Sequence, residues 1–290
     1  MLPEEVRVVE MSYDDAWVRD TGPSFVVHDV AKEVRGVHWR FNAWGGKEEG
    51  CYVSWDRDLL VGRKILELEG MKRFPQDMVL ENGSIHTDGQ GTLLTTEECL
   101  LNPNRNPTLS RAQIERKLCQ CLGLSKVIWL PYGLFGDMDT NGHVDNLACF
   151  VRPGTVLLAW TDDIHHPQHS RSKAALQVLE NSTDARGRPF EVIKLPLPKA
   201  MHITEEEAGG LVAEDAVPRT AGDVLACSYV NFYNANGGLV VPCFGDADCD
   251  MAAASILGRV FQKAVVCVPA REILLGGGGI HCITLSQPAR

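Results

Sequence analysis

One layout of short segments recurs along this chain of 290 residues, and the recurrence restricts the folds that are open to it. Each repeat has two short extended segments, an amphipathic helix and a further apolar strand. The first two repeats are expected as strands over 24–28 and 36–41, a helix over 55–68 and a strand from 78–80, then strands over 84–86 and 92–95, a helix over 109–122 and a strand over 126–130.

Two further repeats keep this order. They are expected as strands over 143–151 and 155–160, a helix over 169–180 and a strand over 190–195, then strands over 224–233 and 238–242, a helix over 247–263 and a strand over 264–268. Turn residues mark both hairpins, at Arg152-Pro153-Gly154 and Asn234-Ala235-Asn236-Gly237. Residues 199–220 are less regular, so we expect a surface excursion there, with Glu205, Glu206 and Glu207 on a solvated face.

No linker rich in proline and serine divides the chain, so residues 1–290 are expected to form a single domain. Strands alternate with helices, and each unit contains a hairpin. This alternation indicates an α/β fold in which similar units pack around a centre, and not a doubly wound parallel sheet.

The composition, 44% hydrophobic and 23% charged, is that of an ordinary globular protein. No apolar run approaches the ~18 residues of a membrane helix, and no charged and then apolar leader opens the chain. We therefore expect a soluble, cytoplasmic protein that does not contact membranes.

Charge and cysteine content narrow the possible ligands. The formal net charge is −10 and no cluster of lysine and arginine is present, which argues against nucleic acid and is consistent with a cationic ligand. Ten cysteines without a secretory leader are expected to be reduced. Cys119 and Cys121 are too close together for a zinc knuckle and lie in an expected helix, so the sequence predicts no metal site.

Four glycines at 276–279 precede Ile280, His281 and Cys282. Glycines leave room for a ligand and permit backbone angles that other residues avoid, so the tract is expected to present the Cys282 thiol in a cleft as a nucleophile. A phosphate-binding loop would need a following Gly-Lys-Ser/Thr and the start of a helix, and neither follows here.

Three other segments place acids or a histidine beside a glycine or a turn. Trp17 and Asp20 belong to the first, Glu81 to the second, and His143 and Asp145 to the third. Each has a structural explanation when taken alone: a helix N-cap, a surface strand end and a structural histidine. Residues two apart on a strand share a face, so the expected strand presents His143 and Asp145 side by side.

Taken together, these segments offer a thiol, an imidazole and several carboxylates. Carboxylates raise the pKa of a nearby thiol and suppress the thiolate, so they suit a nucleophilic cysteine only if the substrate is a cation. A guanidinium is planar, pairs with carboxylates through parallel N–H groups and has an electrophilic central carbon. The sequence therefore favours chemistry on a guanidine.

The four segments resemble, in order, the motifs of agmatine deiminases, which belong with arginine and peptidyl-arginine deiminases to the guanidine-modifying pentein-fold enzymes. The matching stretches are Trp17-Val18-Arg19-Asp20-Thr21-Gly22-Pro23, Glu81-Asn82-Gly83-Ser84-Ile85-His86, Gly142-His143-Val144-Asp145 and Gly277-Gly278-Gly279-Ile280-His281-Cys282. By position, the resemblance implies these roles: Cys282 as nucleophile, His143 as general acid and base, Glu81 as the carboxylate partner of His143, Asp20 and Asp145 as the pair that binds the guanidinium, Trp17 as an aromatic wall, and Gly279 as part of the substrate-binding loop.

The resemblance also implies an activity and an architecture. The activity is hydrolysis of agmatine to N-carbamoylputrescine and ammonia through an amidino-cysteine intermediate, without a metal or organic cofactor, in putrescine and polyamine synthesis. The architecture is a pentein propeller of five ββαβ units around a central active site. Asn82 departs from the motif, which has a glycine there, and only four units can be counted, so the first unit is expected to be missing. An open ring exposes strand edges and apolar faces, so we expect lower stability or self-association.

Other interpretations stay open. An arginine or peptidyl-arginine deiminase would share these residues, and the sequence does not place Arg105, Arg152 or Arg259 relative to a substrate carboxylate. A cysteine hydrolase of acyl groups also uses Cys and His, although three clustered acids and no evident oxyanion donor argue against it. A shortened relative could keep the motifs and act only as a binding or interaction protein.

Overall fold

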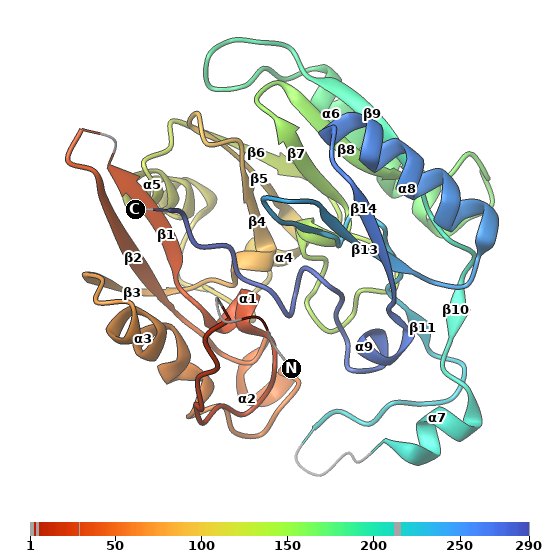
Figure 1. Cartoon of the computed structure of the whole chain (residues 1–290), viewed down its shortest axis with the longest axis horizontal. Helices are drawn as coiled ribbons and strands as arrows, with labels where there is room; N and C mark the ends of the chain where they lie inside the picture. The colour runs from red at the N-terminus through yellow and green to blue at the C-terminus, as the bar shows by residue number, and fades with distance from the viewer. Residues whose placement is uncertain (1–2, 4–5, 29, 212–215, 290) are drawn as a thin grey trace.

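Four three-stranded sheets stand around a common centre in the computed structural model, which describes residues 3, 6–28, 30–211 and 216–289 (Figure 1). In each sheet the first two strands pair antiparallel, and the third, reached through a helix, runs parallel to the second. The units are β1 (Ser24–His28), β2 (Glu33–Arg40), α3 (Asp58–Leu68) and β3 (Arg73–Val79); β4 (Ile85–Thr87), β5 (Thr92–Thr96), α5 (Arg111–Leu122) and β6 (Lys126–Leu130); β7 (Ala148–Arg152), β8 (Thr155–Trp160), α6 (Pro167–Glu180) and β9 (Glu191–Pro196); and β12 (Tyr233–Asn234), β13 (Leu239–Cys243), α8 (Ala247–Phe261) and β14 (Val265–Pro269).

Shorter elements join the units. They are α1 (Val18–Thr21), α2 (Gly46–Glu49), the 3₁₀ turn η1 (Asn82–Ser84), α4 (Glu97–Leu100), the 3₁₀ turn η2 (Val144–Asn146), β10 (Met201–His202), α7 (Glu205–Gly210), β11 (Val224–Leu225) and α9 (Arg271–Leu275). None of the helices in the described part of the chain is both long enough and apolar enough to cross a bilayer.

Three of the helices bridge two units, because each buries apolar side chains against its own sheet and against the last strand of the preceding sheet. The shared clusters join α5 to β3 through Ile114 and Met78, α6 to β6 through Leu179 and Ile128, and α8 to β9 through Leu257 and Leu195. Fully burying one such side chain contributes about 1.5–3 kcal/mol, so the clusters hold neighbouring sheets in register around the centre.

Local sequence explains where the bridging helices begin and end. Ser110 and Gln113 form a capping box ahead of α5, and Gly123 ends that helix in the left-handed conformation. Pro167 occupies the first position of α6, where a missing N–H costs nothing.

The order and pairing of these strands and helices confirm the four predicted ββαβ repeats and the α/β propeller class.

Three expected elements were wrong in detail. Residues 143–147 do not continue the strand of the third repeat, because 144–146 form the 3₁₀ turn η2 and β7 begins at Ala148. The expected strand over 224–233 is broken: β11 pairs with β10, and only Tyr233–Asn234 joins the hairpin, while Tyr229 and Phe232 between them enter the core. The third strand of the first repeat starts at Arg73, five residues earlier than expected. Its first residues are exposed and include charged residues and a proline, so they lack the apolar pattern that predicts a strand.

The surface excursion is more ordered than expected. Thr204 and Glu207 form a capping box at the start of α7, and Glu207 also binds the guanidinium of Arg271. Glu205 and Glu206 are exposed, as expected, but Glu207 is partly buried by this ion pair. Part of the excursion lies outside the described residues.

Candidate active site

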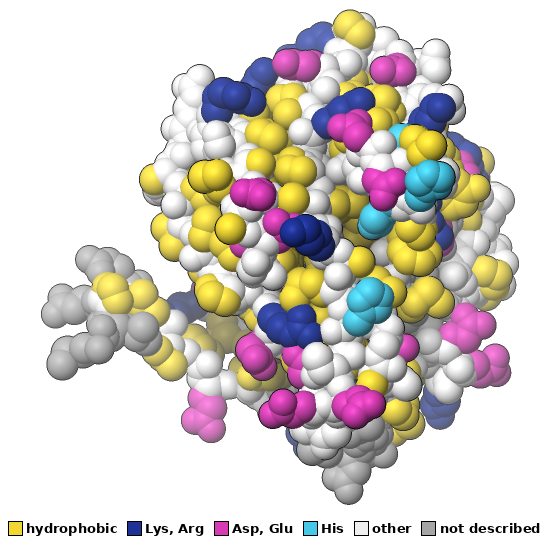
Figure 2. All heavy atoms as spheres, turned by 90° about the vertical axis from the view of Figure 1, so that its right-hand side faces the viewer, with side chains coloured by type: hydrophobic (Ala, Val, Ile, Leu, Met, Phe, Trp, Pro, Cys, Tyr) yellow, Lys and Arg dark blue, Asp and Glu magenta, His cyan; other side chains and the backbone are white. Residues whose placement is uncertain are grey.

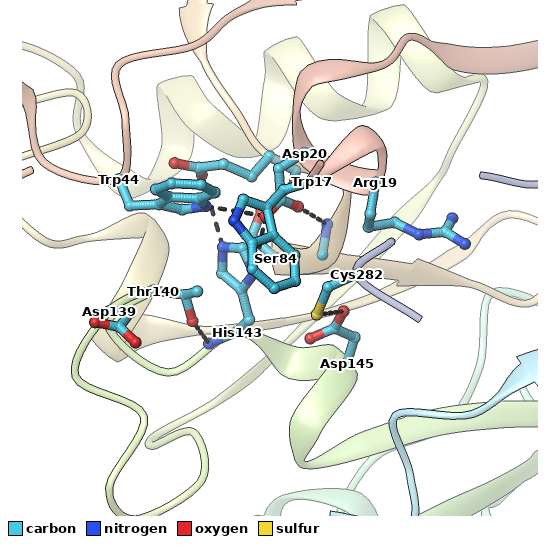
Figure 3. A network of polar contacts seen from close by, with 12 residues as sticks. Trp17, Arg19, Asp20, Trp44, Ser84, Asp139, Thr140, His143, Asp145 and Cys282 are labelled. Carbon is cyan, nitrogen blue, oxygen red and sulfur yellow. Dashed lines mark hydrogen bonds and ion pairs between the residues drawn. The ribbon is translucent and has the colours of Figure 1, made fainter. Parts of the chain in front are cut away.

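Two 3₁₀ turns and the short helix α1 bring predicted site residues together around Gly83 of η1. Figure 3 shows Asp20, His143, Asp145 and Cys282 in one region of the molecule. A Cβ atom on Gly83 would lie 2.6 Å from His143 Nδ1, 2.9 Å from Asp20 Oδ1 and 3.1 Å from Asp145 Oδ2. No other residue fits there, which explains the glycine of the second motif. Three segments far apart in the sequence thus converge at one point.

Cys282 is buried at the same centre and has polar neighbours on two sides. Its Sγ lies 3.8 Å from Asp145 Oδ2, and Asn231 Nδ2 donates to Sγ over 3.3 Å. Burial, followed by the charges of Asp145 and Asp20, raises the pKa of the Cys282 thiol well above its ordinary value. The sulfur is therefore protonated until a positive charge enters the site.

Asp20 is fixed by two hydrogen bonds. Its Oδ2 accepts from Trp44 Nε1 over 2.9 Å and its Oδ1 from the Gly83 amide over 3.0 Å. Burial, together with the charges of Asp145 and Glu81, raises the pKa of Asp20 well above its ordinary value. A buried acid of this kind gains most from a cationic partner.

Asp145 keeps one oxygen open. Its Oδ2 contacts His281 Nδ1 at 2.8 Å, while its buried Oδ1 forms no hydrogen bond with any described residue. Burial raises the pKa of Asp145 to about 7, against the charge of Arg19, which lowers it. Burial and then Arg19 hold the pKa of His281 well below its ordinary value, so this ring is neutral.

His143 is fully buried, and neither of its ring nitrogens has a hydrogen-bond partner among the described residues. Nδ1 lies 3.9 Å from Asp20 Oδ2, and Nε2 lies 4.0 Å from Glu81 Oε2. Burial, followed by the charge of Arg105, lowers the pKa of His143 well below its ordinary value. The ring is therefore neutral at rest and can accept a proton that a reaction delivers.

Glu81 is held from behind by Arg105. Arg105 Nε donates to Glu81 Oε1 over 2.7 Å, and both side chains are completely buried. The same guanidinium donates to the Thr140 carbonyl over 3.0 Å and to Asn141 Oδ1 over 2.7 Å. Because Oε1 is occupied, Glu81 presents only Oε2 to His143.

A cavity of about 180 Å³ reaches Cys282 and Asp20 from the surface, and Trp17 and Trp44 line it. Trp17 is 7% exposed, and its ring packs so closely on the glycine tract that a Cβ on Gly278 would overlap it. The tract was expected to leave room for a ligand, but part of that room is taken by Trp17.

Gly279, the fourth glycine of the tract, does not line this cavity. A Cβ at Gly279 would overlap the Asn231 side chain, so the glycine makes room for the asparagine that donates to Cys282. Its expected part in substrate binding stays a prediction.

One trio of side chains has metal-ligating atoms close enough to share an ion: Glu81, Cys99 and His143, all buried and within 4.8 Å of one another. The guanidinium of Arg105 already contacts Glu81, and its positive charge opposes a divalent cation there. The arrangement suits proton transfer between His143 and Glu81 better than metal binding.

Comparison with known proteins decides the family. Residues 1–288 match the family of Porphyromonas-type peptidyl-arginine deiminases. The chain belongs to this family. Agmatine deiminase from Pseudomonas aeruginosa strain LESB58 is 58% identical over 98% of the chain and 77% of its own length, and that from Medicago truncatula is 55% identical over 99% and 80%. A solved agmatine deiminase from Enterococcus faecalis superposes with a TM-score of 0.90 at 46% identity, over 97% of the chain and 77% of that protein.

The structure brings all four predicted motifs of this deiminase family member together at one site. In the third motif, the local structure differs from the strand that was predicted. His143 precedes η2 and Asp145 lies within it, so they are not two positions on one strand. His143 lies 4.0 Å from Glu81. Asp145 contacts Cys282 (Figure 3). Asn82, which departs from the motif, donates to the Gly22 carbonyl and leaves Glu81 in place.

Several residues of the site were missed from the sequence. Trp44, Asn231 and His281 each bond a predicted site residue, yet Trp44 and Asn231 lie outside the four motifs. Arg105 was considered only as a binder of a substrate carboxylate, and it is buried on Glu81 instead. His281 lies inside the fourth motif, so the motif itself marked it, whereas Trp44, Asn231 and Arg105 lie outside the motifs and no local pattern reveals what they contact.

Proposed function

We propose that this chain hydrolyses agmatine to N-carbamoylputrescine and ammonia, as the names of its relatives suggest, with Cys282 as nucleophile. One observation carries the proposal: a neutral histidine and two buried aspartates meet around Gly83, and the buried thiol of Cys282 contacts one of these aspartates. Burial displaces the pKa values of all four groups. Strongly displaced pKa values cluster at functional sites. Among the described residues, the two buried aspartates also lack a positively charged partner, and a guanidinium supplies one.

The guanidinium binds between Asp20 and Asp145. The open Oδ1 of Asp145 accepts from one nitrogen, and Asp20 accepts from another with the lone pairs that Trp44 and Gly83 leave free. The incoming cation lowers the pKa of both acids and of the Cys282 thiol. Because a buried ion pair that loses one partner costs about 3–5 kcal/mol, Asp20→Asn or Asp145→Asn should abolish most turnover.

In the first half of the reaction, the thiol proton of Cys282 passes to His143 and the sulfur attacks the central carbon of the guanidinium. The C–S bond forms and gives a tetrahedral adduct held by the two aspartates. His143 then returns the proton to one nitrogen, the C–N bond breaks and ammonia leaves. Trp17 covers the site while the amidino-thioether remains on Cys282.

In the second half, water attacks the carbon of the amidino-thioether and gives up a proton to His143. Glu81 Oε2, 4.0 Å from His143 Nε2, stabilises the protonated ring. Collapse of the adduct breaks the C–S bond, and His143 returns its proton to the departing sulfur. The protonated ureido product then loses its extra proton to solvent as it leaves. The same residues could process arginine, so the chemistry alone does not select agmatine.

The test is an assay of ureido product and ammonia with purified chain and equal concentrations of agmatine, arginine and an arginine-containing peptide. We expect turnover of agmatine, and its loss in Cys282→Ser with an unchanged melting temperature. Acid quenching during turnover should trap an adduct on Cys282 that mass spectrometry detects. Absence of turnover with every guanidine, or a Cys282→Ser variant as active as wild type, would contradict the proposal.

We also propose the cytoplasm as the compartment. All ten cysteines are free thiols, an oxidation state that a reducing compartment maintains. The product of the proposed reaction is a precursor of putrescine, so the chain would act in polyamine synthesis. Fractionation of cells that express a tagged chain tests the compartment.

A further inference from the structure

The cavity that reaches Cys282 is also lined by an ion pair between Asp139 and Arg219. Arg219 Nη1 donates to both oxygens of Asp139, over 2.7 and 2.8 Å, and Nη2 donates to the carbonyl of Gly276 over 3.2 Å. Figure 3 shows Asp139 on the far side of His143 from Cys282. The pair therefore lies in the same cavity but away from the sulfur, where the far end of a substrate would lie if its guanidinium is at Cys282.

The ion pair is built into the wall of the cavity. A Cβ at Gly277 would lie 2.6 Å from Asp139 Oδ2, and Gly277 has a φ of 102°, so a glycine is required there on two grounds. The side chains are 23% and 22% exposed, so solvent reaches the pair and a ligand can too. The ion pair contacts the glycine tract that precedes Cys282.

The charges at this end sum to a negative value. Asp139 neutralises Arg219, and Asp15, which also lines the cavity, accepts from Trp17 Nε1 over 2.7 Å and from Tyr52. No other lysine or arginine lines the cavity among the described residues. A ligand end that is an ammonium meets net attraction here, and one that is a carboxylate meets net repulsion.

We propose that Asp139 determines substrate choice by occupying Arg219, which would otherwise bind the α-carboxylate of arginine. An unpaired arginine at the end of the cavity is the fork-shaped donor that carboxylates prefer. With Asp139 in place, that fork is filled and a substrate carboxylate meets two acids instead. The inference rests on the proposed function, because it assumes that a guanidine binds with its carbon at Cys282.

The test compares kcat/KM for agmatine and arginine in wild type, Asp139→Asn and Asp139→Asn with Arg219→Met. We expect Asp139→Asn to raise the ratio of arginine to agmatine turnover by about tenfold or more, because Arg219 is then free to bind a carboxylate. Adding Arg219→Met should return arginine turnover to the wild-type level. Melting temperatures check that all variants are folded.

Glu207→Gln is the matched control, because Glu207 forms an equally direct pair with Arg271 away from the cavity. It should leave the ratio unchanged. An unchanged ratio in Asp139→Asn, or arginine turnover that survives Arg219→Met, would overturn the inference while leaving the proposed function intact.

If wild type turns over no guanidine, the inference is tested by binding instead of turnover. Calorimetry then measures the affinity of arginine for proteins that carry Cys282→Ser. Arginine should then bind Cys282→Ser/Asp139→Asn about tenfold more tightly than it binds Cys282→Ser, and equal affinities would refute the inference independently of catalysis.

Discussion

Asp145 has only two oxygens for three neighbours: His281, Cys282 and the incoming cation. His281 and Cys282 share Oδ2, and Oδ1 is left open within the described structure. No described group donates a hydrogen bond to Oδ1, so the ionised form of Asp145 lacks stabilisation there. Burial raises the pKa of Asp145 to about 7. A protonated carboxyl cannot pair with a guanidinium, so binding should require that this proton leave.

This requirement gives a pH dependence with a definite sign. The folded pKa of Asp145 is raised, so the acid is neutral below about pH 7 and kcat/KM for a guanidine should fall as the pH decreases through that value. In the bound complex the cation lowers the pKa, so the inflection in kcat should lie at lower pH. Profiles of kcat/KM and kcat from pH 5 to 9 measure both. Identical inflections, or a kcat/KM that stays flat down to pH 5, would contradict the assignment.

The pair of Arg105 and Glu81 allows a second test at the scale of single residues. Both side chains are completely buried, so Arg105→Met leaves an unpaired carboxylate in the core and should cost about 3–5 kcal/mol of unfolding free energy. Adding Glu81→Gln should restore much of that stability, because it removes the charge, but should not restore kcat. Denaturant unfolding and steady-state kinetics measure the two effects. Equal stability of the single and double variants would show that the pair is not a unit.

Single residues of the site were predictable where glycine or a turn marks them in the sequence. Cys282, Asp20, Glu81, His143 and Asp145 were all expected, and the structure brings them together. Their partners were not, since a tryptophan, an asparagine or an arginine in a long sequence has no local mark of what it will contact. Only tertiary packing defines the roles of Trp44, Asn231 and Arg105.

At the scale of elements, hydrophobic pattern and turn chemistry identified the four bridging or covering helices and most strands. Two of the three failures share a cause, because they lie where the chain approaches the centre. Residues 144–146 lead directly towards the apolar strand β7, yet they form η2, and His143 and Asp145 face different partners. Residues 226–232 similarly leave the sheet and place Asn231 at Cys282. Functional geometry overrides the local pattern at these positions.

The glycine tract after α9 gives the prediction for this scale. Gly278→Ala should lower both the melting temperature and kcat, because its Cβ would overlap the Trp17 ring, and moving that ring displaces the cavity wall. Overpacking of this kind costs about 1–3 kcal/mol. Gly237→Ala is the control, because a Cβ there meets nothing within 4 Å. Equal effects of the two substitutions, measured by thermal unfolding and kinetics, would contradict this account of the tract.

At the scale of the whole molecule, the fourfold recurrence in the sequence predicted the arrangement of sheets, and the packing shows why it repeats. Leu257 of α8 covers Leu195 of β9, as α6 covers β6 and α5 covers β3. Sequence periodicity alone does not reveal this interlocking, because each helix has one apolar face and the identity of its second partner is a tertiary fact. The chain spans 77–80% of the length of the relatives that it matches, and its single-domain character stays a prediction.

The last strand of the fourth unit differs from those of the others. Val266 of β14 is 58% exposed and Cys267 is exposed, so no described helix covers these side chains as α8 covers β9. Met251 on α8 is 70% exposed. Figure 2 faces this side of the molecule and shows hydrophobic side chains among scattered charged ones over its upper part. By contrast, β3 protects its exposed edge with Arg73, Pro75 and Asp77.

An apolar strand edge of this kind is a template for association, so the 290-residue chain should self-associate through α8 and β14. Replacing Met251 and Val266 by lysine should then reduce the mass measured by light scattering at a given concentration, because charges on an edge oppose pairing. Leu101→Lys, at a partly exposed apolar position in the second unit, is the matched control and should leave the mass unchanged. A wild-type chain that is a monodisperse monomer at every concentration would show that the edge of β14 is tolerated as it stands.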